Sequence, residues 1–354
     1  MNKLSLTPKD LRFDPPSFSQ TALLAEVEKI YGLTGTLKPL AGERDQNHML
    51  KTPDGHRYLV KVAGPNEDKS VVDYQIQTLL HIEQRNPELN IPRNLKTLLG
   101  ENYGLIKLQS GEEHMLRLLS FLDGVPFCEG DEPSPQTLYD AGHFQGQMCA
   151  ALTDFSHPSE GYFMAWDISQ GLVLSPALHV SKYGDVERLV MPLVEHFKNN
   201  VLPKMEHLRK QTIHNDTHDG NVLRSAPDSN DFIGVIDFGD IVYAPVVQDL
   251  SIPMSRFVGL STNPIASASA YVKGFSSTFP LKAEEIDILY DLLLLRACLT
   301  VQLIDFRIAH GDANQEGLIE EYPELVTMLE NLIALDREEI TTALHQANAE
   351  GIGA

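Results

Sequence analysis

Residues 213–223 read Ile-His-Asn-Asp-Thr-His-Asp-Gly-Asn-Val-Leu, and residues 235–240 read Val-Ile-Asp-Phe-Gly-Asp. Each run joins apolar, strand-like residues to a short polar segment, which predicts two loops held by strands. The loops carry two carboxylates, Asp216 and Asp237, and one carboxamide, Asn221. Such a set supplies hard oxygen ligands for a divalent cation and one carboxylate that accepts the proton of an attacking hydroxyl. Phosphoryl transfer needs these two kinds of group, because the transferred phosphoryl mainly requires positioning and charge neutralisation.

The spacing of these residues is typical of kinases. Asn221 follows Asp216 by five positions, as in the H-R-D-x-x-x-x-N loop of protein kinases, and Asp237 opens a D-F-G like the magnesium-binding one of the same enzymes. We therefore predict that Asp216 is the catalytic base and that Asn221 and Asp237 are ligands of Mg²⁺. Only eight residues separate Asp237 from the apolar segment that starts at Val246, too few for an activation loop and a peptide platform. This favours a kinase of small molecules.

Three further stretches, at 42–47, 116–124 and 234–243, make the chain similar to a known family. Together with the loop at 214–221 they resemble the aminoglycoside phosphotransferase and choline kinase-like family and, within it, the hydroxylysine kinase branch. The resemblance implies an ATP-dependent phosphotransferase with an alcohol group as acceptor, an α+β, bilobal protein-kinase-like fold, and ATP and Mg²⁺ as cofactors. The family usually has Gly where this chain has Asn215. Since Asn tolerates positive φ better than most residues, we expect the loop to keep its shape.

The order of the predicted elements fits a small N-lobe at 1–121 and a larger C-lobe at 122–354. In the N-lobe, hydrophobic periodicity predicts an antiparallel sheet plus helix, with elements at 18–31 (a helix between Ser19 and Gly32), 48–51 and 58–62 (a hairpin), 71–83 (a helix) and 104–107 and 113–121 (strands). The resemblance implies that this lobe binds the nucleotide. Its first 15 or so residues are expected to be flexible. The C-lobe is expected to be mostly helical and to hold the catalytic loops and substrate-binding helices, with helices at 134–152, 186–199, 247–258, 264–275, 283–309 and 322–347.

Lys61 and Arg44 of the N-lobe are candidates for contacts with the nucleotide phosphates, and Asp73 is a candidate for positioning Lys61. The resemblance gives Lys61, in an apolar strand, the task of holding the α- and β-phosphates; a solvated surface lysine is the alternative. Asp73 on the following helix is the expected acidic partner of Lys61, with Glu67 in reserve. Arg44, in the turn at 42–47, is a candidate for a further phosphate contact, unless this is an exposed turn without a catalytic role.

The adenine pocket is expected beside the segment at 117–123, which leads from the last strand of the N-lobe towards the C-lobe. Backbone groups of Leu119 and Phe121 are the candidates for contacts with the edge of the base. The alternative is an ordinary core strand that continues into a linker.

The resemblance to the hydroxylysine kinase branch implies an acceptor with an ammonium group and a carboxylate group. Asp240 and Asp167, which is beside the single tryptophan Trp166, are the candidates for the ammonium; a helix cap or a solvated loop residue is the alternative for each. Arg296, in an apolar helix, is the candidate for the substrate carboxylate. An internal ion pair, with Asp291 or Asp305, is the alternative for Arg296.

The histidines of the first loop leave two other functions open. His218 takes the place of a protein-kinase lysine that touches the γ-phosphate, or packs as a hydrogen-bonded loop residue. His214, Asp216, His218 and Asp219 also resemble a chelating cluster, so a metal hydrolase is one alternative, although such sites usually recruit further histidines from distant segments. A non-catalytic pseudokinase is the other. Such proteins typically lose the base or the metal ligand, and this chain has both.

Composition narrows the partners and the compartment. The 28 basic and 49 acidic residues give a formal charge of −21, which disfavours nucleic acid and anionic membrane surfaces. This charge is compatible with a cationic small substrate, although we favour solubility as its explanation. The three cysteines, Cys128, Cys149 and Cys298, are far apart and are expected to be reduced. Residues 1–20 are polar, so we expect no secretory signal, and the most apolar run, at 288–301, contains charged residues and is expected to be a buried helix. We therefore expect a cytoplasmic monomer or homodimer that acts on a small hydroxylated amine or amino acid.

Overall fold

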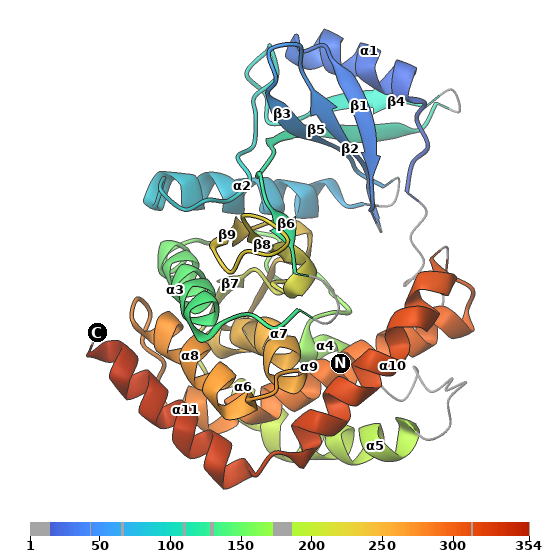
Figure 1. Cartoon of the computed structure of the whole chain (residues 1–354). Helices are drawn as coiled ribbons and strands as arrows, with labels where there is room; N and C mark the ends of the chain where they lie inside the picture. The colour runs from blue at the N-terminus through green and yellow to red at the C-terminus, as the bar shows by residue number, and fades with distance from the viewer. Residues whose placement is uncertain are drawn as a thin grey trace. The chain divides into compact units, whose positions relative to one another are not determined.

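A computed structural model of the chain describes residues 15–42, 44–64, 67–108, 111–127, 131–172, 186–312 and 314–353. The chain divides into two compact units, one made of Arg12–Asp123 and one that contains Gly124–Ala354. Figure 1 labels the helices and strands of both. The expectation for Cys128, and that for residues 1–14, lie outside the described ranges.

The N-terminal unit is built on an antiparallel sheet in the order β1-β2-β3-β5-β4. Its strands are β1 (Thr36–Leu40), β2 (Gln46–Lys51), β3 (Arg57–Val62), β4 (Gly104–Lys107) and β5 (Glu113–Ser120). The predicted hairpin is β2 and β3. Helix α1 (Gln20–Tyr31) begins after Ser19, whose Oγ accepts from the Ala22 N–H at 3.2 Å, and ends at Gly32, whose φ of 70° suits glycine. The predicted cap and end of this helix are confirmed.

Two helices pack against this sheet with different strand residues. Leu23 and Val27 of α1 are buried with Val60 of β3 and Leu118 of β5. Helix α2 (Lys69–Arg85) is two residues longer at each end than the predicted helix at 71–83, and its Val72 and Ile76 are buried with Met115. Because successive strand residues point to opposite faces, Lys61 and Arg117, which are direct partners in the β3–β5 register, lie on the face opposite to Val60 and Leu118.

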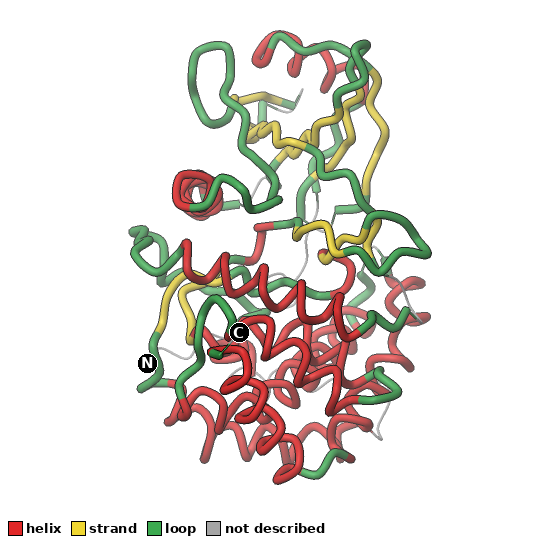
Figure 2. Tube along the Cα trace, turned by 60° about the vertical axis from the view of Figure 1, so that its left-hand side comes forward, coloured by secondary structure: helices red, strands yellow, loops and turns green. Residues whose placement is uncertain are grey.

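The C-terminal unit is mostly helical, so the predicted α+β fold class, with an antiparallel sheet first and helices after, is confirmed. Figure 2 shows its helices in red from a second side. They are α3 (Pro135–Ala151), α4 (Ile168–Gly171), α5 (Val186–His196), α6 (Leu202–Met205), α7 (Val246–Gly259), α8 (Pro264–Ser276), α9 (Ala283–Ala309), α10 (Gln315–Ala334) and α11 (Arg337–Ile352). They enclose one hydrophobic core. Gly142 lets α3 approach α8, since a Cβ there would lie 2.2 Å from the Tyr271 carbonyl oxygen.

Two small sheets in this unit hold the loops that the sequence singled out. Strands β7 (Lys210–Ile213) and β10 (Val242–Pro245) pair antiparallel, with Ile213 opposite Val242. Strands β8 (Val222–Arg224) and β9 (Phe232–Val235) also pair, with Val222 opposite Val235, and β6 (Val125–Pro126) pairs with β8. Residues 214–221 connect β7 to β8, and residues 236–241 connect β9 back to β10. Because the strands pair at both ends, the two loops run side by side.

One predicted helix of the C-terminal unit is wrong. The run at 322–347 was expected to be continuous, but α10 ends at Ala334 and α11 begins at Arg337. Asp336 caps α11, since its Oδ1 accepts from the Glu339 N–H at 2.9 Å. The apolar periodicity resumes after this cap, so periodicity alone predicts one continuous helix.

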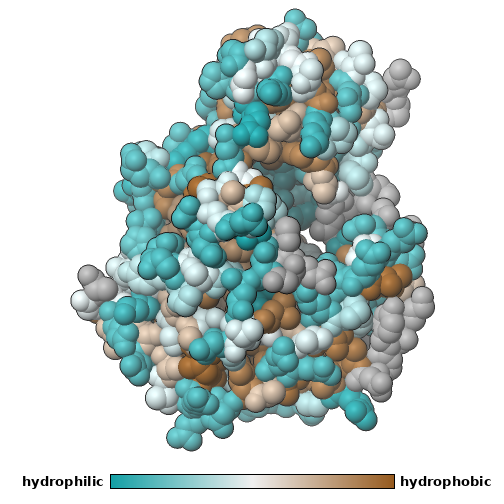
Figure 3. All heavy atoms as spheres, in the orientation of Figure 1, coloured by the Kyte–Doolittle hydropathy of each residue, from teal (hydrophilic) through white to brown (hydrophobic). Residues whose placement is uncertain are grey.

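The remaining expectations about burial agree with the structure. The apolar run at 288–301 lies inside α9 and is almost wholly buried, and no helix among the described residues has the length and apolar character that crossing a bilayer requires. Cys149 and Cys298 are buried free thiols. The face drawn in Figure 3 is largely hydrophilic on both units, with scattered apolar side chains.

Candidate active site

The base and the metal-binding amide predicted in the first loop contact each other directly. Nδ2 of Asn221 donates to Oδ2 of Asp216 at 2.8 Å and to its backbone oxygen at 2.8 Å. This contact fixes the orientation of the amide, so Oδ1 is the Asn221 atom that would meet a cation. The side chain of Asp216 is 22% exposed, which leaves part of its carboxylate accessible to a substrate hydroxyl.

The second loop is tied to the first by backbone and ring contacts. The Ile236 N–H donates to the Asn221 carbonyl oxygen at 3.0 Å. This bond places Asp237, the next residue, close to Asn221, the other expected metal ligand. The rings of His214 and Phe238 meet edge to face with centroids 4.5 Å apart. Asp237 has φ of 61°, and its Oδ1 accepts from the Gly239 N–H at 3.2 Å. The three residues predicted for catalysis and metal binding therefore come from adjacent loops.

The first loop turns at Asn215, whose φ of 62° is the left-handed conformation that the family's Gly implied. The Asn215 N–H donates to Oδ1 of Asp249 at 2.8 Å. Asp249 lies on α7 and is fully buried, which raises the pKa of its carboxyl from 3.8 to about 6 although the Asn215 N–H opposes the rise. A carboxylate on a helix thus holds the strained residue next to the base.

Buried amides extend this support away from the loop. Nε2 of Gln248, next to Asp249 on α7, donates to Oδ1 of Asn215 at 3.2 Å and to Oδ1 of Asp167 at 3.1 Å. Nε2 of Gln145 donates to the Thr217 hydroxyl at 3.2 Å and to the Asp249 carbonyl oxygen at 2.9 Å. The residues on both sides of Asp216 are therefore fixed by a buried hydrogen-bonded network.

Two of the predicted substrate residues, Arg296 and Trp166, lie beside Asp216. The Arg296 guanidinium is 3.8 Å from Oδ1 of Asp216, donates to the Trp166 carbonyl oxygen at 2.8 Å and lies over the Trp166 ring at 5.2 Å. Burial lowers the pKa of Arg296, and the carboxylate of Asp216 opposes this shift. The sequence offered Arg296 an internal ion pair with Asp291 or Asp305, but the acid that it meets is Asp216, while Asp291 contacts Arg337 at 2.5 Å.

The two aspartates proposed for the ammonium are both buried. Asp167 caps α4 and accepts from the Ser169 N–H, the Ser169 hydroxyl and Gln170, so the helix cap offered as its alternative is present. Asp240 ends the short turn Phe238–Asp240 of the second loop. Their contacts with a substrate stay predictions.

The two histidines of the first loop differ. His214 is buried, which lowers its pKa to about 4, so the ring is neutral at pH 7, and its Nδ1 accepts from the Asp216 N–H at 3.2 Å. The side chain of His218 is half exposed. Burial lowers its pKa, but the carboxylates of Asp216 and Asp219 outweigh this and raise it. His218 thus carries more positive charge near neutral pH than an ordinary histidine.

In the N-terminal unit, Lys61 forms an ion pair with an acid that the sequence did not single out. Nζ of Lys61 is 3.3 Å from Oδ2 of Asp45, in the turn before β2, and the same oxygen is 3.9 Å from Arg117. Oδ1 of Asp45 also accepts from the Gly64 N–H at 3.3 Å. Asp73 accepts from Gln77 on its own helix at 3.1 Å. Asp45 is therefore the acid that the sequence analysis missed.

The other two predicted residues near this cluster interact with it or with the sheet. Burial raises the pKa of Glu67, and the cations Arg44, Arg117 and Lys61 oppose the rise, so the reserve candidate and Arg44 both act on the cluster electrostatically. Leu119 pairs with Leu59 in the sheet and is bridged to Asn94 on its other side.

The backbone N–H of Phe121, one of the groups expected at the base edge, already donates to the Arg57 carbonyl oxygen at 3.4 Å. Its ring lies 5.4 Å from the Arg57 guanidinium. Any adenine contact from this segment has to use other groups.

A signal for the missed residues was present in the sequence. Gln248 and Asp249 lie among the apolar residues at the start of α7, and a charged residue in such a place is almost never buried without a specific partner. Asp45 neighbours Arg44 in the turn at 42–47, for which the sequence suggested only the Arg44 cation as a phosphate contact. Neither partner can be read from spacing, because each belongs to a different element.

The donor set fits a hard divalent cation and not zinc. Asn221 and Asp237 offer oxygen atoms, the ligand type that Mg²⁺ prefers. Within the described residues there is no group of three or more His, Cys, Asp or Glu side chains placed to hold a metal ion. The chelating cluster considered for a hydrolase is therefore not assembled by the residues at 214–219.

Comparisons with known proteins point in one direction. The model of the phosphotransferase enzyme family matches residues 36–274. Hydroxylysine kinase of Danio rerio is 26% identical over 337 residues, which cover 92% of this chain and 94% of that protein, and hydroxylysine kinase of Mus musculus is 26% identical over 329 residues, 86% of each.

Solved structures agree on the fold. The amicoumacin kinase hAmiN, in complex with AMP-PNP, Ca²⁺ and Ami, superposes with a TM-score of 0.68 at 15% identity, covering 91% of this chain and 97% of that one. A microcompartment-associated aminopropanol kinase superposes with a TM-score of 0.67 at 14% identity, covering 92% and 97%. The kinase-like fold expected from the sequence is confirmed.

Proposed function

Because the chain belongs to the phosphotransferase enzyme family and is a small-molecule kinase, we propose that it transfers the γ-phosphate of ATP to the hydroxyl group of hydroxylysine or of a closely related amino alcohol. The observation that carries this proposal is the Asp216–Asn221 contact at 2.8 Å beside the loop of Asp237. The coverage of more than nine tenths of a hydroxylysine kinase supports the choice of acceptor.

In this mechanism Asp216 accepts the proton of the acceptor hydroxyl as its oxygen forms a bond to the γ-phosphorus and the bond to the bridging oxygen of ADP breaks. Asn221 and Arg296 hold the carboxylate of Asp216 from two sides, at 2.8 Å and 3.8 Å. Asp249 keeps the loop in its left-handed turn through the Asn215 N–H. The base is thus held in place before the substrate arrives.

Asn221 and Asp237 are the residues that would hold Mg²⁺, which when bound neutralises charge on the nucleotide phosphates. Lys61, fixed by Asp45, is proposed to contact the phosphates from the N-terminal unit, and Arg44 is a second candidate. His218, with its raised pKa, is proposed to add positive charge near the transferred group.

The proposal is tested with purified protein, ATP, MgCl₂ and a panel of acceptors that contains hydroxylysine, homoserine, choline, ethanolamine and an aminoglycoside. We expect ADP and phosphohydroxylysine as products, detected by coupled assay and mass spectrometry. Asp216→Asn should lower kcat by about 10²- to 10⁴-fold, because it removes the proton acceptor but keeps the shape that Asn221 contacts.

The matched control is Asp228→Asn, an exposed aspartate on the turn between β8 and β9, which should keep full activity. Equal melting temperatures of the two variants would exclude unfolding as the cause. A protein that binds ATP but phosphorylates none of these acceptors would support the pseudokinase instead, and an Asp216→Asn variant with full activity would remove Asp216 as the base.

A further inference from the structure

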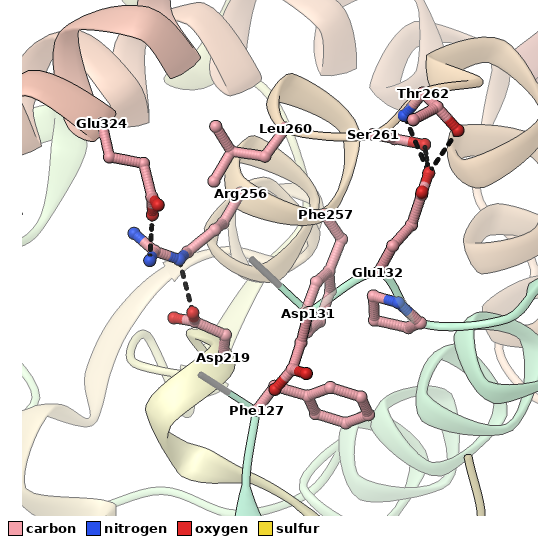
Figure 4. Close-up of a pocket in the computed structure, with 11 residues that line it drawn as sticks. Phe127, Asp131, Glu132, Asp219, Arg256, Phe257, Leu260, Ser261, Thr262 and Glu324 are labelled. Carbon is pink, nitrogen blue, oxygen red and sulfur yellow. Dashed lines mark hydrogen bonds and ion pairs between the residues drawn. The ribbon is translucent and has the colours of Figure 1, made fainter. Parts of the chain in front are cut away.

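A cavity of about 280 Å³ lies in the C-terminal unit next to the catalytic loop. Figure 4 shows the side chains that line it. One wall is Asp219, which lies between Asp216 and Asn221 in the sequence, and the Asp219 carbonyl oxygen accepts from the Phe127 N–H at 3.2 Å. The other walls come from residues 131–133, the end of α7 and Glu324 of α10. The cavity therefore shares a wall with the loop that bears the base, and none of its lining was predicted as a substrate site.

The lining is strongly acidic. Asp131, Glu132, Asp219 and Glu324 contribute four carboxylates, and Arg256 contributes the single guanidinium, a formal charge of −3. Even with Arg224, which pairs with Asp131 at 2.5 Å without lining the cavity, the charge is −2. A cavity with this charge repels a carboxylate or a phosphate and attracts a cation.

The acids are held in place by other residues of the same unit. Arg256 forms ion pairs with Asp219 through Nε and with Glu324 through a terminal nitrogen, so it links the catalytic loop to α10. Glu132 accepts from the Thr262 N–H at 2.7 Å and from the Ser261 hydroxyl at 3.0 Å, and these bonds hold the pKa of Glu132 below its usual value. Figure 4 shows both groups of contacts as dashed lines. The negative charge is thus fixed at the walls rather than carried on mobile side chains.

The rest of the lining suits a short carbon chain. The rings of Phe127 and Phe257 meet edge to face, with centroids 5.8 Å apart, and Leu260 and Pro133 add apolar surface. A volume of about 280 Å³ is below the roughly 300–1,000 Å³ of most ligand pockets, so the cavity takes one arm of a small molecule and not a nucleotide. Aromatic faces and fixed carboxylates together recognise alkylammonium groups.

We propose that this cavity binds an alkylammonium arm of the acceptor while the acceptor's hydroxyl group is presented to Asp216. The inference deepens the proposed function and rests on it. It gives Asp131, Glu132 and Glu324 a role in choosing a cationic acceptor, and it gives Phe127 and Phe257 the contact with its methylene groups. Arg256 keeps the catalytic loop and α10 in the register that forms the cavity.

The first test uses the unaltered protein and three acceptors with ATP and MgCl₂: hydroxylysine, 2-amino-5-hydroxyhexanoic acid, which lacks the side-chain ammonium, and 6-amino-5-hydroxyhexanoic acid, which lacks the α-ammonium. We expect 2-amino-5-hydroxyhexanoic acid to lose at least about tenfold in kcat/KM relative to hydroxylysine, because the side-chain ammonium is the arm that enters an acidic cavity without an attached carboxylate. If 2-amino-5-hydroxyhexanoic acid matches hydroxylysine, the inference is overturned while the kinase assignment stays intact. Failure to phosphorylate all three would count against the proposed function itself.

The second test compares two glutamates that contact the same arginine. Glu324 lines the cavity, whereas Glu321, whose Oε1 is 3.6 Å from Arg256, is exposed and does not. Glu324→Gln should raise KM for hydroxylysine about tenfold, leave KM for ATP unchanged and shrink the difference between hydroxylysine and the weaker analogue. Glu321→Gln should do none of these. Equal effects of the two variants would mean that Glu324 acts only by holding Arg256, and would overturn the inference.

Discussion

The catalytic loop of the C-terminal unit and the Lys61 cluster of the N-terminal unit fix their functional side chains in different ways. The loop is held by backbone and amide hydrogen bonds to one fully buried carboxylate, Asp249. Lys61 lies in a cluster of opposite charges, with Asp45 at 3.3 Å and the buried Arg117 on the neighbouring strand. A buried carboxylate fixes the backbone that it contacts and makes the free energy of unfolding depend on pH. A cluster of opposite charges contributes less to folding and mainly sets the electrostatic potential around Lys61. We therefore expect damage to the first region to appear in folding and damage to the second in nucleotide use.

The largest effect that this comparison predicts is a pH dependence of stability that comes from Asp249. Its folded pKa of about 6 is above its unfolded value of 3.8, so the folded protein binds the proton more tightly. Stability contributed by this protonation is fully present below pH 3.8 and is lost as the pH rises through 6. Relative to Asp249→Asn, the free energy of unfolding of the unaltered protein should fall by on the order of 2 kcal/mol between pH 4 and pH 7. Urea unfolding of both proteins at several pH values measures the difference.

Asp249→Asn is a suitable reference because its amide oxygen still accepts from the Asn215 N–H while the titratable group is gone. Unfolding curves of the two proteins that stay parallel from pH 4 to pH 7 would show that Asp249 does not carry a raised pKa. The two regions would then no longer differ in this respect.

The two regions also differ in how far the sequence specified them. Asp216, Asn221 and Asp237 lie within 22 residues of one another, and their spacing alone predicts loops that the pairing of β7 with β10 and of β8 with β9 brings together. The left-handed conformation of Asn215 was equally predictable, because it depends on one residue's own backbone. Features that depend on residue spacing or on the backbone of one residue can therefore be predicted from the sequence.

The missed side-chain partners of Lys61 and of the catalytic loop depend on contacts between distant segments. Lys61 meets Asp45 only because the turn before β2 folds back over the end of β3, and Asp249 meets the loop across 34 residues. The break between α10 and α11 is the exception, since Asp336 and Glu339 have the spacing of an N-terminal cap and were hidden only by the apolar periodicity around them. Side-chain partners from distant segments can be identified only in the folded chain, whereas the Asp336 cap could have been identified in the sequence.

A smaller effect distinguishes Asp45 from Asp73 as the acid that positions Lys61. Asp45→Asn removes the carboxylate 3.3 Å from Nζ of Lys61 and should lower kcat/KM for ATP about tenfold, close to 1.4 kcal/mol, without changing KM for the acceptor. Asp73→Asn is the matched control, because Asp73 lies on the following helix and accepts from Gln77. It should change kcat/KM for ATP less. Steady-state kinetics with ATP varied at saturating acceptor gives both values.

A larger loss in Asp73→Asn than in Asp45→Asn would restore the pairing expected from the sequence for the enzyme at work. Melting temperatures that stay within a few degrees of the unaltered protein would confirm that neither variant acts through unfolding. In that case the N-terminal cluster affects nucleotide use and not folding, as the comparison requires.

The smallest predicted effect concerns the backbone of Asn215. Asn215→Gly and Asn215→Ala both remove the oxygen that accepts from Gln248 at 3.2 Å, so they differ only in how well each tolerates φ of 62°. At an ordinary negative φ the Ala variant would be the more stable one, because Gly loses more chain entropy on folding. Here we expect the order to be inverted, with Asn215→Ala about 1 kcal/mol less stable than Asn215→Gly by chemical denaturation. An Ala variant as stable as the Gly variant would mean that residue 215 does not keep its positive φ. The role of Asp249 in holding this conformation would then be contradicted.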